Sequence, residues 1–332
     1  MQYLKTYLNK IIARGNEKLA ESISKTAEDV GDKYIKNFSF TSHEVGLLFG
    51  NVQSGKTGQM FGIISKATDL GFPVFLLLTT DNVVLQQQTL DRVKADLEGY
   101  CICGENDARV FIDNSLLQPT IVVLKKNVRM LKLWANIFNS TGFMKGNPLF
   151  IVDDEADAAS LNTLVNRDKQ SSINKYLDSI KNGSSSSIYL QVTGTPQAIL
   201  LQTMASGWHP YFTYYFQPGE SYLGGDFFFP VSGKGSSIKY LDEVENSAKA
   251  VVLRHIAVSA QILASGKKVS NCLIHPSVRQ SVHQKYADDI THELAWCIEH
   301  KNDDFTEDIK REYENISPSK TEKVGLDVFI QK

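Results

Sequence analysis

The chain has 332 residues, of which 42% are hydrophobic and 22% charged, and its formal net charge is −2. This length accommodates more than one hydrophobic core, and the composition is that of a globular protein. The near-neutral charge excludes a protein-wide basic field of the kind that attracts nucleic acid, but it leaves room for a local basic groove. No apolar run has the length of a signal-peptide core or a membrane span, so we expect a cytoplasmic protein with no membrane partner.

Residues 1–42 are predicted to form an N-terminal helical segment. Between residues 16 and 38, apolar side chains recur at helical spacing on one face: Leu19, Ile23, Ala27, Val30, Tyr34 and Phe38. Acidic residues and lysines lie between them, which indicates an amphipathic helix packed against a larger body. We expect no catalytic role for this segment.

A G-x-x-x-x-G-K-T sequence, residues 50–57, directly follows the apolar run 45–49. A strand, a glycine-rich turn and a helix in this order are typical of a phosphate-binding loop, because backbone N–H groups and the helix dipole converge on one anion. Lys56 would reach the β- and γ-phosphates, and Thr57 would place its hydroxyl on Mg²⁺. We expect ATP and Mg²⁺ to be bound here by Gly50, Asn51, Gln53, Ser54, Gly55, Lys56, Thr57 and Gly58.

Apolar runs alternate with helical patterns from this loop onward. The predicted strands are 45–49, 73–78, 120–124, 149–152 and 187–192, and the predicted helices between them are 58–70, 83–97 and 127–139. Such alternation predicts parallel βαβ units and an α/β fold with a doubly wound sheet. Ligands of these sheets bind at the carboxyl ends of the strands, so catalytic residues are expected there.

An acidic cluster, Asp153-Asp154-Glu155-Ala156-Asp157, ends one of these strands. Carboxylates beside a buried strand are costly unless a cation neutralises them, and Mg²⁺ on nucleotide phosphates is the natural partner. In this interpretation Asp154 holds the metal and Glu155 is the general base for water, so that Asp154, Glu155 and Lys56 are the catalytic residues. Asp157 lies beyond the metal and would couple the site outward. The alternative is an acidic helix N-terminus stabilised by the helix dipole.

The strand 187–192 ends in Thr193-Gly194-Thr195-Pro196. Two hydroxyls around a glycine could pass hydrogen bonds on from the acidic cluster, so Thr193 and Thr195 are predicted coupling residues. An ordinary strand-to-helix cap, with Pro196 at the first helical position, explains the same residues and is compatible with coupling.

A basic cluster follows the strand 120–124, and its members Lys125, Lys126 and Arg129 are candidate contacts to nucleic-acid phosphates. A solvated helix face explains the cluster equally well. Residues 208–229 contain ten aromatic residues among twenty-two but no lysine or arginine. Base stacking without a basic groove is an unlikely nucleic-acid site, so we predict that residues 206–266 are an aromatic-rich insert and linker with its own small core.

These motifs together resemble superfamily-two helicases and translocases. Residues 50–57 resemble their first motif, 79–80 the next, 154–157 their Asp-Glu-Ala-Asp box and 193–195 their Ser-Ala-Thr motif. With 218–225, 273–277 and His283, the chain is similar to the Z-one domain family of endonuclease-like proteins. The resemblance implies a RecA-like P-loop ATPase lobe at 43–205 and the start of a second lobe at 267–332, with a strand at 269–275 and a helix at 278–287.

The resemblance also implies a function: an ATP-hydrolysing, helicase- or translocase-like module that acts on DNA in a bacterial restriction or phage-defence system. Implied partners are DNA, an Hsp90-like ATPase and restriction or methylase components. One alternative is a Mg²⁺-dependent endonuclease that uses Asp153, Asp154 and Glu155 directly, and another is a nucleotide-gated assembly module. No glycine-arginine motif precedes Lys332, so we expect slow hydrolysis without an arginine finger from elsewhere.

Overall fold

A computed structural model describes residues 2–52, 54–115, 117–140, 146–158, 171–200, 209–220, 222–228, 247–277, 279–300 and 305–315. It divides into two units, Met1–Gly224 and Gly225–Lys332.

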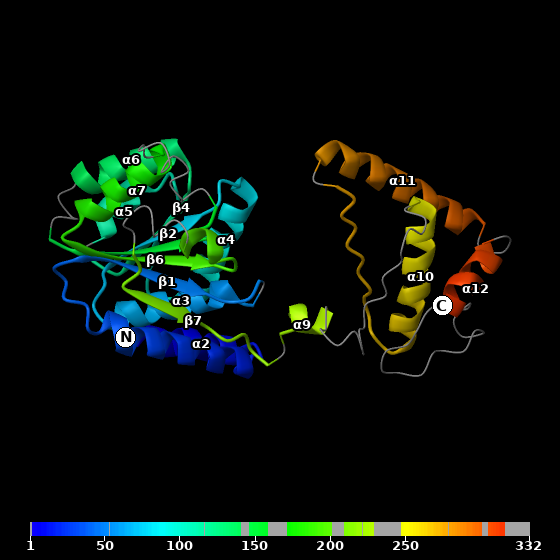
Figure 1. The fold of residues 1–332 in the computed structure, drawn as a ribbon, viewed down its shortest axis with the longest axis horizontal. Helices are drawn as coiled ribbons and strands as arrows, with labels where there is room; N and C mark the ends of the chain where they lie inside the picture. Colours follow the sequence, from blue (N-terminus) through cyan, green and yellow to red (C-terminus); the bar gives the residue numbers. More distant parts are fainter. Residues whose placement is uncertain are drawn as a thin grey trace. The chain divides into compact units, whose positions relative to one another are not determined.

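The first unit is built on a seven-stranded sheet in which every pairing is parallel, in the order β3-β4-β2-β5-β6-β1-β7 (Figure 1). Its strands are β1 (His43–Phe49), β2 (Val74–Thr79), β3 (Cys101–Cys103), β4 (Thr120–Lys125), β5 (Pro148–Asp154), β6 (Ser186–Thr193) and β7 (Phe212–Tyr215). The five strands expected from the sequence are confirmed, as is the doubly wound α/β fold.

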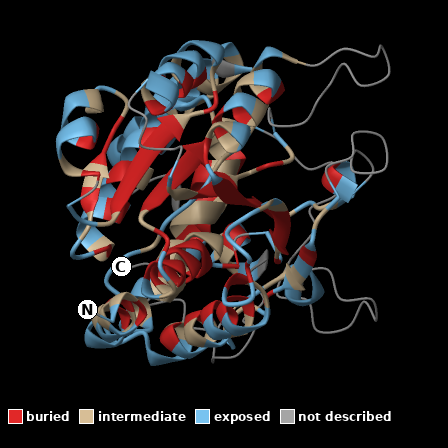
Figure 2. Ribbon diagram, turned by 90° about the vertical axis from the view of Figure 1, so that its left-hand side faces the viewer, coloured by how far each residue is buried: buried red, intermediate tan, exposed pale blue. Residues whose placement is uncertain are grey.

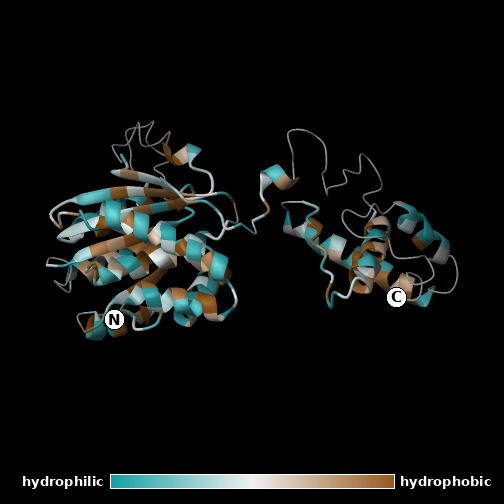
Figure 3. Ribbon diagram, turned by 90° about the horizontal axis from the view of Figure 1, so that it is seen from below, coloured by the Kyte–Doolittle hydropathy of each residue, from teal (hydrophilic) through white to brown (hydrophobic). Residues whose placement is uncertain are grey.

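Helices cover both faces of this sheet (Figures 1 and 2). One face packs against α1 (Tyr3–Ala13), α2 (Glu17–Val30), α3 (Lys56–Asp69) and α4 (Val83–Asp96), and the other against α5 (Ala108–Asn114), α6 (Val128–Ser140) and α7 (Ser172–Gly183). Strand side chains alternate between the two cores: Phe75 and Leu77 of β2 join the first, and Leu76 and Leu78 the second. The apolar runs are therefore continuous because both faces are buried. In Figure 3 the helices of this unit carry both teal and brown, as amphipathic covering helices should.

The N-terminal helices are part of the same unit as the sheet. Helix α2, which continues as a π-helical turn over Gly31–Ile35, packs against α3. A Cβ atom on Gly62 of α3 would lie 2.5 Å from Cγ2 of Ile23, so glycine permits the close approach of the two helices. The predicted amphipathic helix is confirmed, and it supports the helix that begins at the phosphate loop.

The aromatic stretch differs from the predicted separate core. Residues 212–215 form β7, which pairs in parallel with β1. The ring of Phe212 stacks on Tyr34 with centroids 4.4 Å apart, and a Cβ on Gly46 of β1 would lie 2.3 Å from that ring. This part of the stretch is an edge of the sheet, because its rings fill space that β1 leaves open with glycine.

The described part of the second unit is helical, with α9 (Gly225–Phe228), α10 (Ala248–Ala264), α11 (Gln280–Glu299) and α12 (Phe305–Asn315). Its core joins side chains of α10 to Cys297 of α11 and Ile309 of α12. Residues 269–275 form no strand here, in contrast to the sequence prediction, whereas the helix expected at 278–287 is present as the longer α11. A second RecA-like lobe stays a prediction. Among the helices that the structure describes, none has the length and apolar character to cross a membrane.

Candidate active site

The phosphate loop joins β1 to α3 at the carboxyl edge of the sheet. The Gly50 N–H donates to the Thr193 carbonyl of β6 at 3.4 Å, and the Ser54 hydroxyl donates back to the Asn51 carbonyl at 2.5 Å. Gly55 has a φ of 91°, in the left-handed region that favours glycine, and it caps the N-terminus of α3. The loop is therefore a tight turn with a helix N-terminus at its end, as predicted. Gln53 lies outside the described residues.

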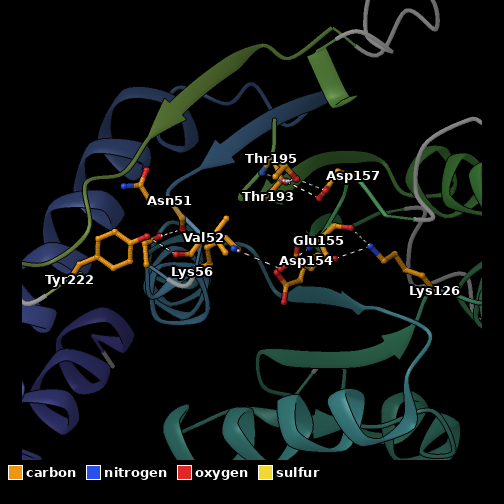
Figure 4. A network of polar contacts seen from close by, with 11 residues as sticks. Asn51, Val52, Lys56, Lys126, Asp154, Glu155, Asp157, Thr193, Thr195 and Tyr222 are labelled. Atoms are coloured by element: carbon orange, nitrogen blue, oxygen red, sulfur yellow. Dashed lines mark hydrogen bonds and ion pairs between the residues drawn. The ribbon is translucent and has the colours of Figure 1, made fainter. Parts of the chain in front are cut away.

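Lys56 and Thr57 are the first two residues of α3. The Lys56 side chain is only 11% exposed, and its Nζ lies 3.7 Å from Oε1 of Glu155, which is 44% exposed. A Cβ on Gly194 would lie 3.1 Å from the same Nζ. The structure thus brings the lysine of the loop, the glutamate after β5 and the glycine after β6 together, and Figure 4 shows Lys56 directed toward Glu155. Thr57 and Gly58 are half-buried beside them.

Asp154 is the last residue of β5, and its carboxylate has an unfavourable environment. Burial and the neighbouring Glu155 carboxylate raise the pKa of Asp154 to about 6, against the opposing effect of Lys126 and Lys56. Its Oδ1 accepts from the Glu155 N–H at 3.1 Å. A divalent cation would remove this electrostatic cost by favouring the charged carboxylate.

Glu155 has a φ of 51°, which is unusual for a residue with a side chain. Left-handed backbone costs about 1 kcal/mol or more for such residues, and it persists only where the surroundings impose it. Several hydrogen bonds hold this turn. The ammonium of Lys126 donates to the carbonyls of Asp154 at 2.7 Å, Glu155 at 2.8 Å and Ala158 at 3.1 Å, and the Ala156 N–H donates to the Val192 carbonyl of β6 at 3.0 Å.

Lys126 is fully buried, which corrects its predicted role as a nucleic-acid contact. It reaches from the end of β4 to the turn after β5. Its Nζ also lies 3.0 Å from Oδ1 of Asp153, which is equally buried. The three ammonium hydrogens are directed to backbone carbonyls, so the interaction between Lys126 and Asp153 is an electrostatic attraction between opposite charges. The other carboxylate oxygen of Asp153 accepts from the Tyr189 hydroxyl at 2.7 Å. Lys126 is a structural cation inside the acidic turn.

The other two members of the basic cluster differ from Lys126 and from each other. Lys125 pairs with Glu105 at 3.5 Å, and each side chain is only about 15% exposed, so its charge is mostly neutralised. Arg129 is exposed on α6. Of the three predicted contacts, Arg129 alone presents a solvent-facing charge that is available to a phosphate.

Asp157 connects the acidic turn to the Thr193-Gly194-Thr195 segment. Its Oδ1 accepts from the Thr193 hydroxyl at 2.7 Å and its Oδ2 from the Thr195 hydroxyl at 2.5 Å, while the Thr195 N–H donates to Thr193 Oγ1 at 2.9 Å. Burial raises the pKa of Asp157, but the bonds from Thr195 and Thr193 outweigh it and leave the pKa below its usual value. The predicted contact between these residues is present in the structure, and Figure 4 shows the network beside Glu155.

The residues present fit a nucleoside triphosphate with Mg²⁺. The loop supplies backbone N–H groups and Lys56 for phosphates, and Asp154 supplies a buried carboxylate whose charged form a cation would favour. Thr57 is the second residue of α3, in the position from which a hydroxyl joins the metal of such sites. Sequence reasoning named Lys126 as a nucleic-acid contact and missed its structural role in the acidic turn, which only its burial beside Asp153 reveals.

Comparison with known proteins yields no matching family model and no matching curated protein. Among solved structures, the chain is similar to the Hef helicase domain of Pyrococcus furiosus, with a TM-score of 0.40 and 14% identity over 86% of this chain. The chain spans 55% of that structure's chain. It is also similar to the ORC2 protein of Aeropyrum pernix, with a TM-score of 0.32, 11% identity and coverage of 82% of this chain and 84% of that one. For PCH-2 of C. elegans the TM-score is 0.27, at 10% identity over 95% and 66% of the two chains.

Proposed function

We propose that this protein binds ATP with Mg²⁺ and hydrolyses it, and that the reaction drives a helicase- or translocase-like action on DNA. The observation that carries the ATPase proposal is the meeting of Lys56, Glu155 and Gly194, from three strand ends, within one site. The three strand ends carry the phosphate loop, the acidic cluster and the Thr193-Gly194-Thr195 segment, and ATP hydrolysis uses the first two directly.

Each residue of the site has a role in hydrolysis that follows from its position. Lys56 exchanges its Glu155 partner for the terminal phosphates, which frees the Glu155 carboxylate. Asp154 and Thr57 would hold Mg²⁺, which supplies charge stabilisation to the phosphates. Glu155 then accepts a proton from the attacking water, since it is the half-exposed carboxylate nearest the loop lysine. Lys126 holds the turn that aims Glu155, and it is a positioning residue.

The DNA part of the proposal rests on the Asp157 network and on the resemblance to helicases and translocases. The Asp157 network joins the acidic turn to the segment after β6, as a device that transmits the state of the nucleotide would require. The resemblance to the Z-one domain family extends the proposal to a restriction or phage-defence system. Arg129 is the contact to DNA that this proposal retains.

The endonuclease alternative requires Asp153, Asp154 and Glu155 to share a metal. Asp153 is already paired with the buried Lys126 and bonded by Tyr189, so it faces away from any ion at Asp154 and Glu155. The geometry therefore favours nucleotide hydrolysis over direct cleavage by these three carboxylates.

The test is ATP binding and ATP hydrolysis by wild type, Lys56→Ala and Glu155→Gln, each with and without single- and double-stranded DNA. We expect Lys56→Ala to lose binding, and Glu155→Gln to keep binding while hydrolysis falls by about 10²-fold or more. Wild-type hydrolysis that Glu155→Gln leaves unchanged would refute the assigned base. Hydrolysis that no form of DNA stimulates would refute the translocase part alone.

A further inference from the structure

A cavity of about 720 Å³ lies against the phosphate loop and has no role in the chemistry described above. Three separate segments form its walls: the turn between α1 and α2, the loop itself, and the segment after β7. The lining residues on which the argument depends are Asn16, Leu19, Val52, Glu220, Tyr222 and Leu223. Its size is within the range of small-molecule sites.

The cavity and the acidic turn lie on opposite sides of the loop. In Figure 4 Tyr222 approaches Val52 from one side, and Asp154 and Glu155 lie beyond Lys56 on the other. The Tyr222 hydroxyl donates to the Val52 carbonyl at 2.6 Å, which ties the segment after β7 to the loop. A triphosphate whose terminal group meets Lys56 and Glu155 would therefore direct its other end toward the cavity.

The cavity wall includes apolar side chains that are exposed to solvent. Val52 is 58% exposed and Leu223 55% exposed, and Leu19, half-buried, lies beside Gly55 of the loop. With the Tyr222 ring they form apolar surface of the kind that the faces of a nucleobase cover. Burying such surface against a base favours binding.

Asn16 supplies a polar group in the same wall. It is the N-cap residue of α2, yet its side chain accepts no hydrogen bond from the N–H groups in the first turn of that helix. Among the described residues, its side chain bonds to the Arg14 carbonyl alone, by a long donation at 3.4 Å. An asparagine at this position ordinarily caps its helix, so the amide has a donor and an acceptor to offer to a base edge or a ribose. The ion pair of Lys18 and Glu220 joins α2 to the segment after β7 along the rim.

We propose that this cavity holds the nucleoside part of the bound nucleotide, with Leu19, Val52 and Leu223 against the base and Asn16 bonded to it. The proposal rests on the proposed nucleotide site, since it assigns the end of the ligand that the phosphate loop does not hold. Residues of the α1–α2 turn and of the segment after β7 then make the protein bind a nucleotide more tightly than inorganic polyphosphate.

The experiment compares two ligands by calorimetric titration of the full chain in Mg²⁺: ATP and inorganic tripolyphosphate. The variants are wild type, Lys56→Ala, the double variant Asn16→Ala/Leu223→Ser, and Leu117→Ser as the control. Leu117 is 78% exposed and lies outside the cavity. Thermal unfolding of each variant verifies its fold, and the two substituted cavity residues are exposed enough to leave the core intact.

We expect the double variant to bind ATP at least tenfold more weakly and tripolyphosphate unchanged, Lys56→Ala to weaken both ligands, and Leu117→Ser to change neither. Equal affinity of the wild type for ATP and tripolyphosphate would overturn the nucleoside site, as would an unchanged ATP affinity in the double variant. Loss of both ligands in the double variant would also overturn it. If neither ligand binds the wild type, the proposed nucleotide function fails together with the nucleoside site.

Discussion

The ammonium of Lys126 donates to the backbone carbonyl of Glu155 at 2.8 Å and holds that residue at a φ of 51°. The lysine follows β4 and the glutamate follows β5, with β2 between those strands. A buried cation therefore helps to hold the backbone of the proposed general base in place. Its charge is neutralised by Asp153, which is equally buried, and not by solvent.

Replacing Lys126 by methionine leaves the Asp153 carboxylate buried without its cation. Because breaking one side of a buried ion pair costs about 3 to 5 kcal/mol, we expect the free energy of unfolding to fall by this amount. Chemical denaturation monitored by circular dichroism measures it. The matched control is Lys132→Met, since Lys132 is exposed on α6 and its loss should change stability by no more than about 0.5 kcal/mol.

A second substitution separates lost charge balance from lost packing. Asp153→Asn in the Lys126→Met background removes the uncompensated charge, so the double variant should regain part of the lost stability. Asp153→Asn alone is measured as well. If the stability lost by the double variant equals the sum of the losses in the two single variants, the ion pair is not the source of the effect. A Lys126→Met protein of normal stability with weaker DNA binding would restore the predicted nucleic-acid role.

Two substitutions of Glu155 separate the effect of its strained backbone on stability from the effect of losing its carboxylate. Glu155→Gly should raise the free energy of unfolding by about 1 kcal/mol, because glycine adopts a positive φ without steric cost. Glu155→Gln keeps the strained backbone and should show no such gain, although both variants lose the carboxylate and its contact with Lys56. Denaturation curves of the two variants measured together decide the matter, and equal stability would show that φ at this residue carries no strain.

The sequence predicts the five central strands because each is an apolar run long enough to be recognised, and it predicts the strand-end motifs because their residue types are unusual there. It does not predict β3, which has only three residues, or β7, whose aromatic residues show no alternation. Their places depend on the neighbours, as Phe212 shows by packing where Gly46 leaves room. Lys125 and Lys126 look alike in the sequence, and only their partners in the fold separate them: the largely buried Lys125 pairs with Glu105, and the fully buried Lys126 pairs with Asp153.

Asp154 makes stability depend on pH. Its pKa is about 6 in the folded protein and about 3.9 in an unfolded chain. Between these values the folded state binds more protons than the unfolded state, so stability falls as pH rises from about 4 to about 6 and stays reduced above that range. Asp154→Asn should therefore be more stable than wild type by about 3 kcal/mol at pH 7.5, and the difference should shrink toward zero at pH 4.

The measurement is urea denaturation of both proteins at the two pH values, with chelator present so that no divalent cation favours the carboxylate. Adding Mg²⁺ and a non-hydrolysable ATP analogue should stabilise wild type more than Asp154→Asn at pH 7.5. A stability difference that is the same at both pH values would mean that ionisation of Asp154 is not its cause.

Thr195 tests whether the Asp157 network couples hydrolysis to DNA. The Thr195 hydroxyl is exposed and donates to Asp157 at 2.5 Å, while Thr193 bonds the other carboxylate oxygen. Thr195→Ala removes one charge-assisted hydrogen bond, worth about 1.5 kcal/mol, and leaves the other in place. We expect ATP binding and basal hydrolysis to be unchanged, and the DNA-stimulated rate to fall about tenfold.

The control is Thr6→Ala, since Thr6 on α1 makes only a local bond to the Gln2 carbonyl at 3.1 Å among the contacts that the structure describes. Steady-state ATPase assays with increasing DNA give the stimulated and the basal rates from one titration. An equal fall in both rates would place Thr195 in the hydrolytic machinery itself. Because its hydroxyl touches Asp157 and neither Glu155 nor Lys56, a selective loss of stimulation is the result that the geometry requires of a coupling residue.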